Sequence, residues 1–221
     1  KIIIRDIIYR YFAWLTALRY HLREHRVWET TKLKSNIAFS RFFTVPEFET
    51  KMEDELKKYL SASDLEYILT KKNKAAQIIA MQSAQLKKLK AEGKLSEFDF
   101  IELEKTLASF YDDQGRSERI KNFPYPRQFA TINQMFVRLF IAMLPLGIVQ
   151  EFGKLTNGAD DLFIWATVPC SVIVAFVFHV MERIGEATEK PGEGGANDGP
   201  SSAISRGIEI DLRDMLDEKD L

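Results

Sequence analysis

The feature that most constrains this chain is an uninterrupted apolar run at residues 162–181, LFIWATVPCSVIVAFVFHVM, with no formally charged residue before Glu182 and Arg183. At about 1.5 Å per residue, a helix of these 20 residues is about 30 Å long, which is the thickness of a bilayer's hydrocarbon core. The run therefore predicts a membrane-spanning helix. The alternative is a core helix of a soluble protein, which is usually shorter and carries a polar stripe.

A second apolar segment, residues 129–149, precedes this run but contains Asn133, Gln134, Arg138 and Pro145. Because polar groups at membrane depth usually face a bundle interior or a cavity, we interpret it as a second spanning helix. A buried amphipathic helix is the alternative. Arg138 has two interpretations: a functional charge within the membrane, or a charge near the start of the helix that snorkels to the interface.

The flanks of this hairpin predict its orientation. The hairpin is preceded by the basic residues Arg116, Arg119, Lys121 and Arg127. Its connecting loop, residues 150–161, contains only one basic residue, Lys154. Since basic flanks stay on the cytoplasmic side, we expect a multi-pass protein of the cell (inner) membrane. Most of the chain, residues 1–128 and 182–221, is then cytoplasmic, and residues 129–181 form the transmembrane hairpin.

The rest of the chain has the periodicity of helices, and no segment alternates cleanly enough to predict a strand. We therefore predict an all-α fold, in which a membrane helical bundle is continuous with a cytosolic helical module. The expected helices of that module cover residues 1–24, 47–60, a short segment opened by a capping box of Ser63 and Glu66, 74–92, and a stretch that begins after Ser96.

Two prolines separate this module from the hairpin. Pro124 and Pro126 cannot continue a regular helix, because proline lacks an N–H and restricts the residue before it. After the hairpin, residues 190–202 are rich in Gly, Pro and Ser, and an acidic helix follows. That helix needs a partner surface, in this subunit or a neighbour, for the apolar positions Ile204, Ile208, Leu212 and Leu216.

Composition excludes several classes of function. The 221 residues carry a formal net charge of −1, whereas nucleic-acid binding needs a concentrated excess of Lys and Arg. Cys170 is the only cysteine, so an intrachain disulfide and a cysteine-based zinc cage are excluded. Because the chain begins at Lys1 rather than Met, we also expect a preceding segment that this sequence lacks.

One pattern points to an enzyme. His21, Glu24 and His25 match the H-x-x-E-H pattern of inverted zinc peptidases, in which two histidines on one helical face share a metal and the glutamate acts as base. The third histidine, His179, lies in an apolar run, and no third ligand is marked. We therefore favour the polar end of an amphipathic helix, and we expect neither enzyme activity nor a bound metal or cofactor.

Several motifs resemble the bestrophin family in its bacterial form. The specific one is the tail, ERIGEATEKPGEGGANDGP at 182–200 followed by ISRGIEIDLRDML at 204–216. Supporting matches are RYHLR at 19–23, GKL at 93–95, and ERIK at 118–121 leading into PYP at 124–126. These motifs cover nearly the whole chain in the expected order.

The resemblance implies an ion channel: a homopentamer of mostly helical subunits in membrane lipid, around one central pore that passes small monovalent ions. The ion is chloride in the calcium-activated eukaryotic relatives, or a cation in bacterial relatives. The family's hydrophobic neck lies on an early membrane helix that this sequence lacks, so the chain looks like the C-terminal two thirds of a subunit. The alternative function is a membrane-tethered helical scaffold or regulator without a pore.

The resemblance also implies a second constriction at the cytosolic mouth, a few residues after the Gly-Lys-Leu turn. Matching that turn to residues 93–95 places Phe98 at or beside the constriction, with Leu95 as the alternative. Ions must shed part of their hydration to cross a narrow apolar ring, so such a ring can gate by dewetting. The alternative for Phe98 is ordinary helix packing.

Two departures from the family pattern lie in the tail. Lys190, Pro191 and Gly192 stand where family members usually have Asn-Pro-Phe. Residues 193–198, EGGAND, contain few carboxylates where calcium-gated relatives have an acidic run. Calcium prefers six to eight oxygen ligands, often including several carboxylates. We therefore predict no calcium clasp.

Overall fold

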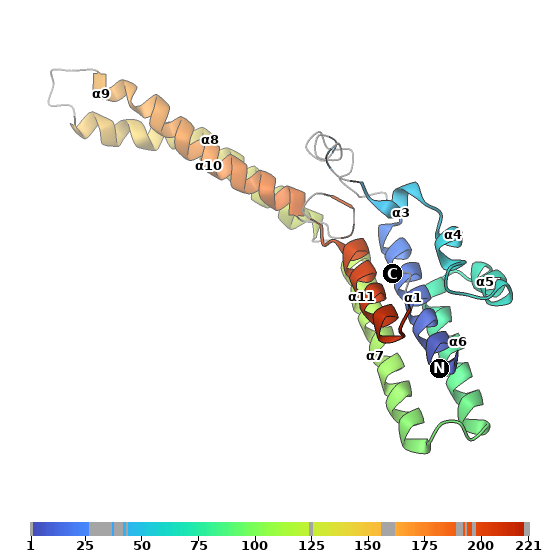
Figure 1. Ribbon diagram of the computed structural model, residues 1–221. Helices are drawn as coiled ribbons and strands as arrows, with labels where there is room; N and C mark the ends of the chain where they lie inside the picture. Colours follow the sequence, from blue (N-terminus) through green and yellow to red (C-terminus); the bar gives the residue numbers. More distant parts are fainter. Residues whose placement is uncertain are drawn as a thin grey trace. The chain divides into compact units, whose positions relative to one another are not determined.

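The computed structural model describes residues 2–26, 37, 42, 44–123, 126–155, 162–188, 192, 194–195 and 198–218. Throughout these residues the regular structure is helical and no strand is present, which confirms the all-α prediction. The helices form two compact units (Figure 1). The core unit comprises Lys1–Phe123 with Pro191–Leu221, and the hairpin unit comprises Pro124–Lys190.

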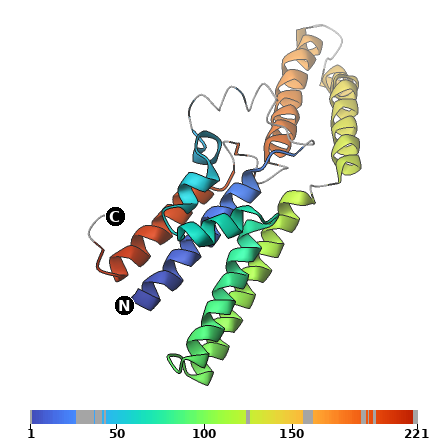
Figure 2. The ribbon, with the colours of Figure 1, turned by 90° about the vertical axis from the view of Figure 1, so that its right-hand side faces the viewer.

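The core unit is organised around its first helix. α1 packs against α3, α4, α6, α7 and α11, and α6 packs against α7 as an antiparallel hairpin (Figures 1 and 2). The elements of this unit are α1 (Ile2–Arg23), α3 (Pro46–Glu49), α4 (Met52–Leu56), α5 (Ala62–Leu69), α6 (Lys74–Ala91), α7 (Glu97–Asn122) and α11 (Ser201–Met215).

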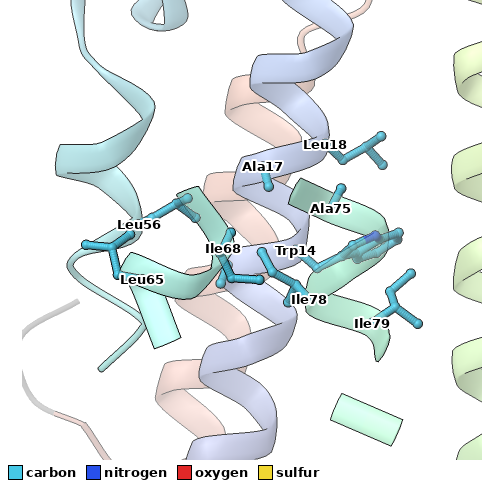
Figure 3. Close-up of a cluster of buried hydrophobic side chains, with 10 residues drawn as sticks. Trp14, Ala17, Leu18, Leu56, Leu65, Ile68, Ala75, Ile78 and Ile79 are labelled. Atoms are coloured by element: carbon cyan, nitrogen blue, oxygen red, sulfur yellow. The ribbon is translucent and has the colours of Figure 1, made fainter. Parts of the chain in front are cut away.

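Apolar faces of α1, α4, α5 and α6 meet in one hydrophobic cluster (Figure 3). Leu56 and Ile68 are fully buried and Ile78 is 1% exposed. Each fully buried side chain of this kind contributes about 1.5–3 kcal/mol relative to its exposed state. The cluster consists of Ala13, Trp14, Ala17, Leu18, Leu56, Leu65, Ile68, Ala75, Ile78 and Ile79.

A buried polar network joins α1 to α6 and α7. Gln114, which is 1% exposed, accepts a hydrogen bond from the Trp14 indole at 2.9 Å. Its amide donates to the Asn73 side chain at 3.1 Å and to Glu118 at 2.7 Å. Asn73 in turn accepts from the N–H of Ala76 and caps α6. Because Gln114 of α7 bonds both to Trp14 of α1 and to Asn73 at the start of α6, the network fixes the register of three helices.

Two local predictions for the core unit are wrong. The short helix α5 is capped by Ser61, whose hydroxyl accepts from the N–H of Asp64 at 3.2 Å, and not by Ser63. The helix expected at 47–60 is split into α3 and α4. Thr50 has extended backbone there, and its hydroxyl donates to the Pro46 carbonyl at 2.9 Å, so the side chain competes with continuation of the helix.

The tail helix α11 packs against α1. Its apolar positions Ile208, Leu212 and Leu216 are half-buried, and Ile204 is 57% exposed. The partner surface that the sequence required is therefore found within this chain for most of the stripe.

The hairpin unit contains α8 (Arg127–Leu155), α9 (Leu162–Trp165) and α10 (Thr167–Thr188), and α8 packs against α10. The rings of Phe140 and Phe178 meet edge to face, with centroids 4.7 Å apart. The helix predicted at 162–181 is interrupted at Ala166 and then extends to Thr188. Pro169 has no N–H to donate to the carbonyl of Trp165, which accounts for the interruption.

Two helices of this unit are long and apolar enough to cross a membrane, Gln128–Lys154 and Thr167–Glu186. Of their apolar windows, 0% and 6% are buried. Core helices of soluble proteins are mostly buried, so these helices have the exposure of lipid-facing elements.

Candidate functional site

The turn between α6 and α7 has a fixed backbone. Gly93 adopts a left-handed conformation with φ of 68°. Its N–H donates to the carbonyl of Lys90, and the N–H of Lys94 donates to the carbonyl of Leu89, both at 3.0 Å. This pair of bonds is a Schellman motif, which ends α6 at a defined point. Any other residue at position 93 would be strained, because side chains disfavour positive φ.

The start of α7 is fixed in the same way and presents Phe98 outward. The Ser96 hydroxyl accepts from the N–H of Asp99 at 3.1 Å and donates to its carboxylate at 2.6 Å. Phe98 is in the first turn and is 85% exposed, whereas Leu95 is half-buried. Among the described residues, therefore, Phe98 is not packed against neighbouring helices.

Ion pairs surround this turn. Lys90 lies 2.6 Å from Glu97, and Lys94 lies 2.6 Å from Glu92. The hydrogen bond from Lys94 lowers the pKa of the Glu92 carboxyl. Exposed pairs of this kind add little stability. Their consequence is local: of the two acidic residues beside Phe98, Glu97 has a basic partner, and Asp99 accepts from the Ser96 hydroxyl.

Arg138, the other predicted polar candidate, lies off the seam of the hairpin unit. Half-buried residues of α8 recur three or four apart, as on one face of a helix, at Gln134, Val137, Ile141, Leu144 and Ile148. Arg138 is outside this row and exposed. Pro145 lies inside α8 without ending it.

The hairpin unit also buries two hydroxyl groups that the sequence did not single out. Thr167 is 7% exposed and Ser171 is 6% exposed, and neither hydroxyl has a hydrogen-bond partner in the described part of the chain. They are four apart in α10, so they share one helical face. Their signal in the sequence was only a pair of small polar residues in an apolar run.

The break between the two units falls at the predicted prolines. α7 ends at Asn122 and α8 begins at Arg127, directly after Pro126. The Pro126 carbonyl accepts from the N–H of Phe129 at 2.9 Å, which starts the new helix. Pro124 lies outside the described residues.

The Gly-rich segment before α11 forms a cradle around one carboxylate. Asp198 accepts hydrogen bonds from the N–H groups of Gly192 and Gly194 at 2.9 Å, and it pairs with the buried guanidinium of Arg23. Both glycines have positive φ, 88° and 81°. The sequence motifs did not predict this cradle, although glycine spacing before an Asp is the pattern that such a turn requires.

Two effects oppose each other at this carboxylate. Burial alone would raise the pKa of the Asp198 carboxyl, but hydrogen bonds from Gly192 and Gly194 and the charge of Arg23 outweigh it and hold the pKa below its usual range. Asp198 therefore stays ionised and tied to protein donors near neutral pH.

The peptidase pattern is not assembled. α1 ends at Arg23, so His25 lies beyond the helix, where its ring stacks on Phe48 with centroids 4.9 Å apart. His21 Nδ1 lies 3.5 Å from Glu24. In the described ranges, no group of three or more His, Cys, Asp or Glu residues is placed to hold a metal ion. The two histidines thus have different surroundings and do not converge.

Comparison with known proteins gives a consistent result. A family model described as "Bacterial/Fungal Bestrophin protein" matches residues 3–214. The voltage-dependent anion channel-forming protein YneE of Salmonella typhi is 29% identical over 189 residues, which is 86% of this chain and 59% of that protein. A protein with the same description from Ralstonia nicotianae, RSc3414, is 27% identical over 172 residues, 78% of this chain and 53% of that one.

Solved structures share the fold. The crystal structure of a bacterial bestrophin homolog from Klebsiella pneumoniae superposes with a TM-score of 0.72 at 23% identity, covering 96% of this chain and 65% of that one. A mutant of the same homolog gives a TM-score of 0.72 at 24% identity. The chain thus spans about 59% of the length of the first curated relatives it matches.

Proposed function

The chain belongs to the bacterial and fungal bestrophin family, and from this premise we propose that it is part of a membrane ion-channel subunit that assembles as a homopentamer and passes small monovalent ions. The relatives named above are described as channel-forming proteins, which supports this function. No enzyme activity is part of the proposal. Because the chain spans only part of its relatives, the activity is proposed for the whole protein.

The proposed membrane segment is the hairpin unit. Of the apolar windows of its two candidate spans, only 0% and 6% are buried, and their basic flanks favour a cytoplasmic location for the core unit. In domain terms, residues 1–128 and 182–221 are cytosolic and residues 129–181 are transmembrane. The inner membrane of a bacterial cell is the proposed location.

The observation that carries the pore assignment is the fixed, exposed position of Phe98. A Schellman motif before it and a Ser96 cap beside it hold the first turn of α7, and the ring is 85% exposed in the single chain. A mobile or buried ring could not form a defined aperture. We assign Phe98 to the cytosolic constriction, where five such rings would make ions shed part of their hydration. Leu95, half-buried behind it, is the second candidate.

Arg138 is the proposed intramembrane polar residue. It lies 11 residues into α8, roughly 16 Å along a helix, which is about half the thickness of a hydrocarbon core. A guanidinium facing lipid at that depth is costly, and Arg138 is off the α8–α10 seam. We therefore assign it to contacts with protein outside the described chain rather than to lipid.

The experiment that tests the function uses the full-length protein, purified in detergent. Its mass, measured by light scattering with the detergent contribution subtracted, is expected to equal five subunits, and proteoliposomes are expected to pass monovalent ions. A monomer that gives no flux would contradict the proposal and favour the scaffold function without a pore.

A further inference from the structure

A polar cavity of about 460 Å³ lies in the core unit between α1, α11 and the C-terminal end of α4. Cavities of this size are typical of small-molecule sites. Nothing in the proposed channel function uses it. Its polar lining includes Arg19, Lys58, Tyr59, Arg206, Glu209 and Arg213.

Arg19 is the most enclosed cation of the cavity, with a side chain 14% exposed. Its Nε lies 2.8 Å from the fully buried carboxylate of Glu47, but the geometry is not that of a hydrogen bond. The same carboxylate oxygen already accepts from the Ser202 hydroxyl at 2.6 Å. No described residue accepts a hydrogen bond from the Arg19 guanidinium. Arg19 is therefore ion-paired through Nε, and the remaining four N–H donors of this largely buried guanidinium have no acceptor among the described residues.

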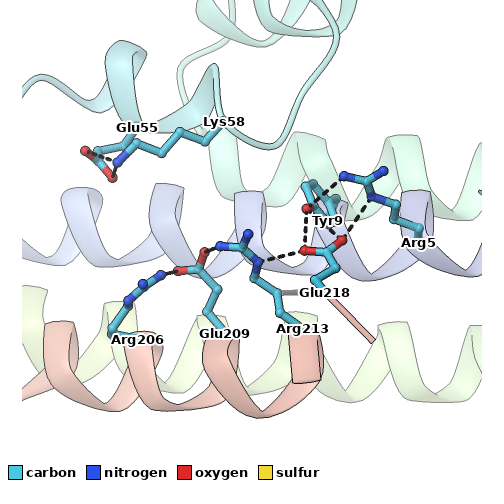
Figure 4. Close-up of polar contacts among 8 residues, drawn as sticks. All are labelled: Arg5, Tyr9, Glu55, Lys58, Arg206, Glu209, Arg213 and Glu218. Atoms are coloured by element: carbon cyan, nitrogen blue, oxygen red, sulfur yellow. Dashed lines mark hydrogen bonds and ion pairs between the residues drawn. The ribbon is translucent and has the colours of Figure 1, made fainter. Parts of the chain in front are cut away.

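The cations of the cavity are balanced by carboxylates. The lining contains four basic side chains and two acidic ones, Glu55 and Glu209. Two further carboxylates, Glu47 and Glu218, pair with Arg19 and Arg213 from outside the lining. Lys58 pairs with Glu55 at 2.7 Å, and Arg206 pairs with Glu209 at 2.9 Å (Figure 4). Both cations are about half exposed, 58% and 48%, and exposed ion pairs are weak, so a ligand can replace the carboxylate partner at little cost.

Arg213 is held differently from these two cations. It pairs with Glu209 at 3.4 Å and with Glu218 at 2.8 Å, and Glu218 also accepts from the Tyr9 hydroxyl at 3.0 Å (Figure 4). This network closes one wall of the cavity by tying the end of α11 to α1. Arg213 therefore shapes the cavity, while Arg19, Lys58 and Arg206 remain to bind.

We propose that this cavity binds a small organic anion that carries carboxylate or phosphate oxygens, with Arg19 as its anchor and Lys58 and Arg206 as its outer contacts. The planar guanidinium matches two oxygens of either group. A single chloride ion would not span cations contributed by three segments. The bound anion connects α1, the end of α4 and α11, so it stabilises the packing of the tail helix on the core unit.

The test is isothermal titration calorimetry on the full-length protein in detergent, at constant ionic strength in sodium chloride, with citrate in one arm and pyrophosphate in the other. Saturable binding of at least one probe is expected, and the arm that binds more tightly identifies the preferred oxygen chemistry. Lys58→Gln and Arg206→Gln are each expected to weaken binding about tenfold or more, because each removes a charge-assisted contact. No saturable binding in either arm would overturn the proposal.

Two further variants separate the site from general charge effects. Arg116→Gln removes an equally charged side chain of α7, 77% exposed and outside the cavity, and is expected to leave binding unchanged. Arg19→Lys keeps a cation beside Glu47 but removes the planar fork, so it is expected to weaken binding while the helical circular dichroism is retained. Equal weakening by Arg116→Gln, or full binding by Arg19→Lys, would contradict the assignment. Ion flux plays no part in these readouts, so they stand apart from the channel proposal.

Discussion

The core unit and the hairpin unit are both helical, yet they place their apolar side chains in opposite ways. In the core unit, Ile78 and Leu86 are each 1% exposed. In the hairpin unit, Phe136 and Phe176 are 63% and 65% exposed. Water drives the first arrangement, whereas the second is stable only in an apolar solvent such as a bilayer. The difference shows that helices of one chain can place their apolar side chains inward or outward, according to whether the surrounding solvent is water or lipid.

The strongest test of this comparison is to truncate the same side chain, isoleucine to alanine, in both units. Ile78→Ala in α6 is expected to destabilise the protein by about 2–5 kcal/mol, because it leaves a cavity in the core. Ile173→Ala in α10, where the side chain is 63% exposed, is expected to cost about 1 kcal/mol or less. Thermal unfolding of the full-length protein in detergent, followed by circular dichroism, measures both. Similar costs would mean that the hairpin is packed as a soluble core.

A charge that replaces an exposed aromatic side chain should be costly in the hairpin unit, which faces lipid, and tolerated in the core unit, which faces water. Phe176→Lys near the middle of α10 is expected to disfavour insertion by about 2.5–3.5 kcal/mol, because an ammonium would enter the hydrocarbon core. Tyr67→Lys on the core unit, where the side chain is 45% exposed, is the matched control and should have little effect. The measurement is the fraction of protein that resists alkaline extraction from membranes. Unchanged retention of the Phe176 variant would argue against a spanning α10.

The buried polar network offers a smaller contrast. Gln114→Ala leaves the Trp14 indole without its acceptor, removes one of the donors to Asn73, and is expected to cost about 1–3 kcal/mol. Gln128→Ala removes an exposed glutamine of α8 and is expected to be nearly neutral. Denaturant titration of the two variants compares them. A neutral Gln114 variant would show that the network does not hold the three helices.

The smallest expected effect is a pH dependence confined to the core unit. The pKa of the Asp198 carboxyl is held below its unfolded value of about 3.8, so its stabilisation is present above that pH and is lost as the pH falls through the folded pKa. Thermal unfolding midpoints between pH 7 and pH 3 should therefore fall more steeply in the wild type than in Asp198→Asn. Parallel curves for the two proteins would exclude Asp198 as a source of acid sensitivity.

The sequence predicted well those features that a local pattern determines. The α6–α7 turn follows from Gly93 and Ser96, and the break before α8 follows from prolines, because backbone chemistry alone dictates these points. Cap choice was harder: Ser61 and Ser63 are both plausible caps, and the structure uses Ser61, which accepts from the N–H of residue 64. The interruption at Ala166 was missed because hydropathy does not register the hydrogen bond that Pro169 cannot make.

Features that join distant segments could not be predicted in the same way. Gln114 contacts Trp14, which is 100 positions earlier in the sequence, and Arg23 pairs with Asp198, which follows the hairpin unit in the sequence. No periodicity links such pairs, since they are brought together only by packing of the helices. The cavity around Arg19 belongs to this class, because three separate segments supply its cations. The sequence predicted the turn that precedes Phe98, but only the structure gives the exposure of its side chain.

The most direct test of the central claim is single-channel recording of the full-length protein in planar bilayers, comparing wild type with Phe98→Ala. Tyr111→Ala, about 20 Å further along α7 and 57% exposed, is the matched control. If five Phe98 rings form the constriction, the Phe98 variant should change conductance or ion preference and the Tyr111 variant should not. Identical conductance and reversal potential for wild type and Phe98→Ala would contradict the assignment of the pore to this turn.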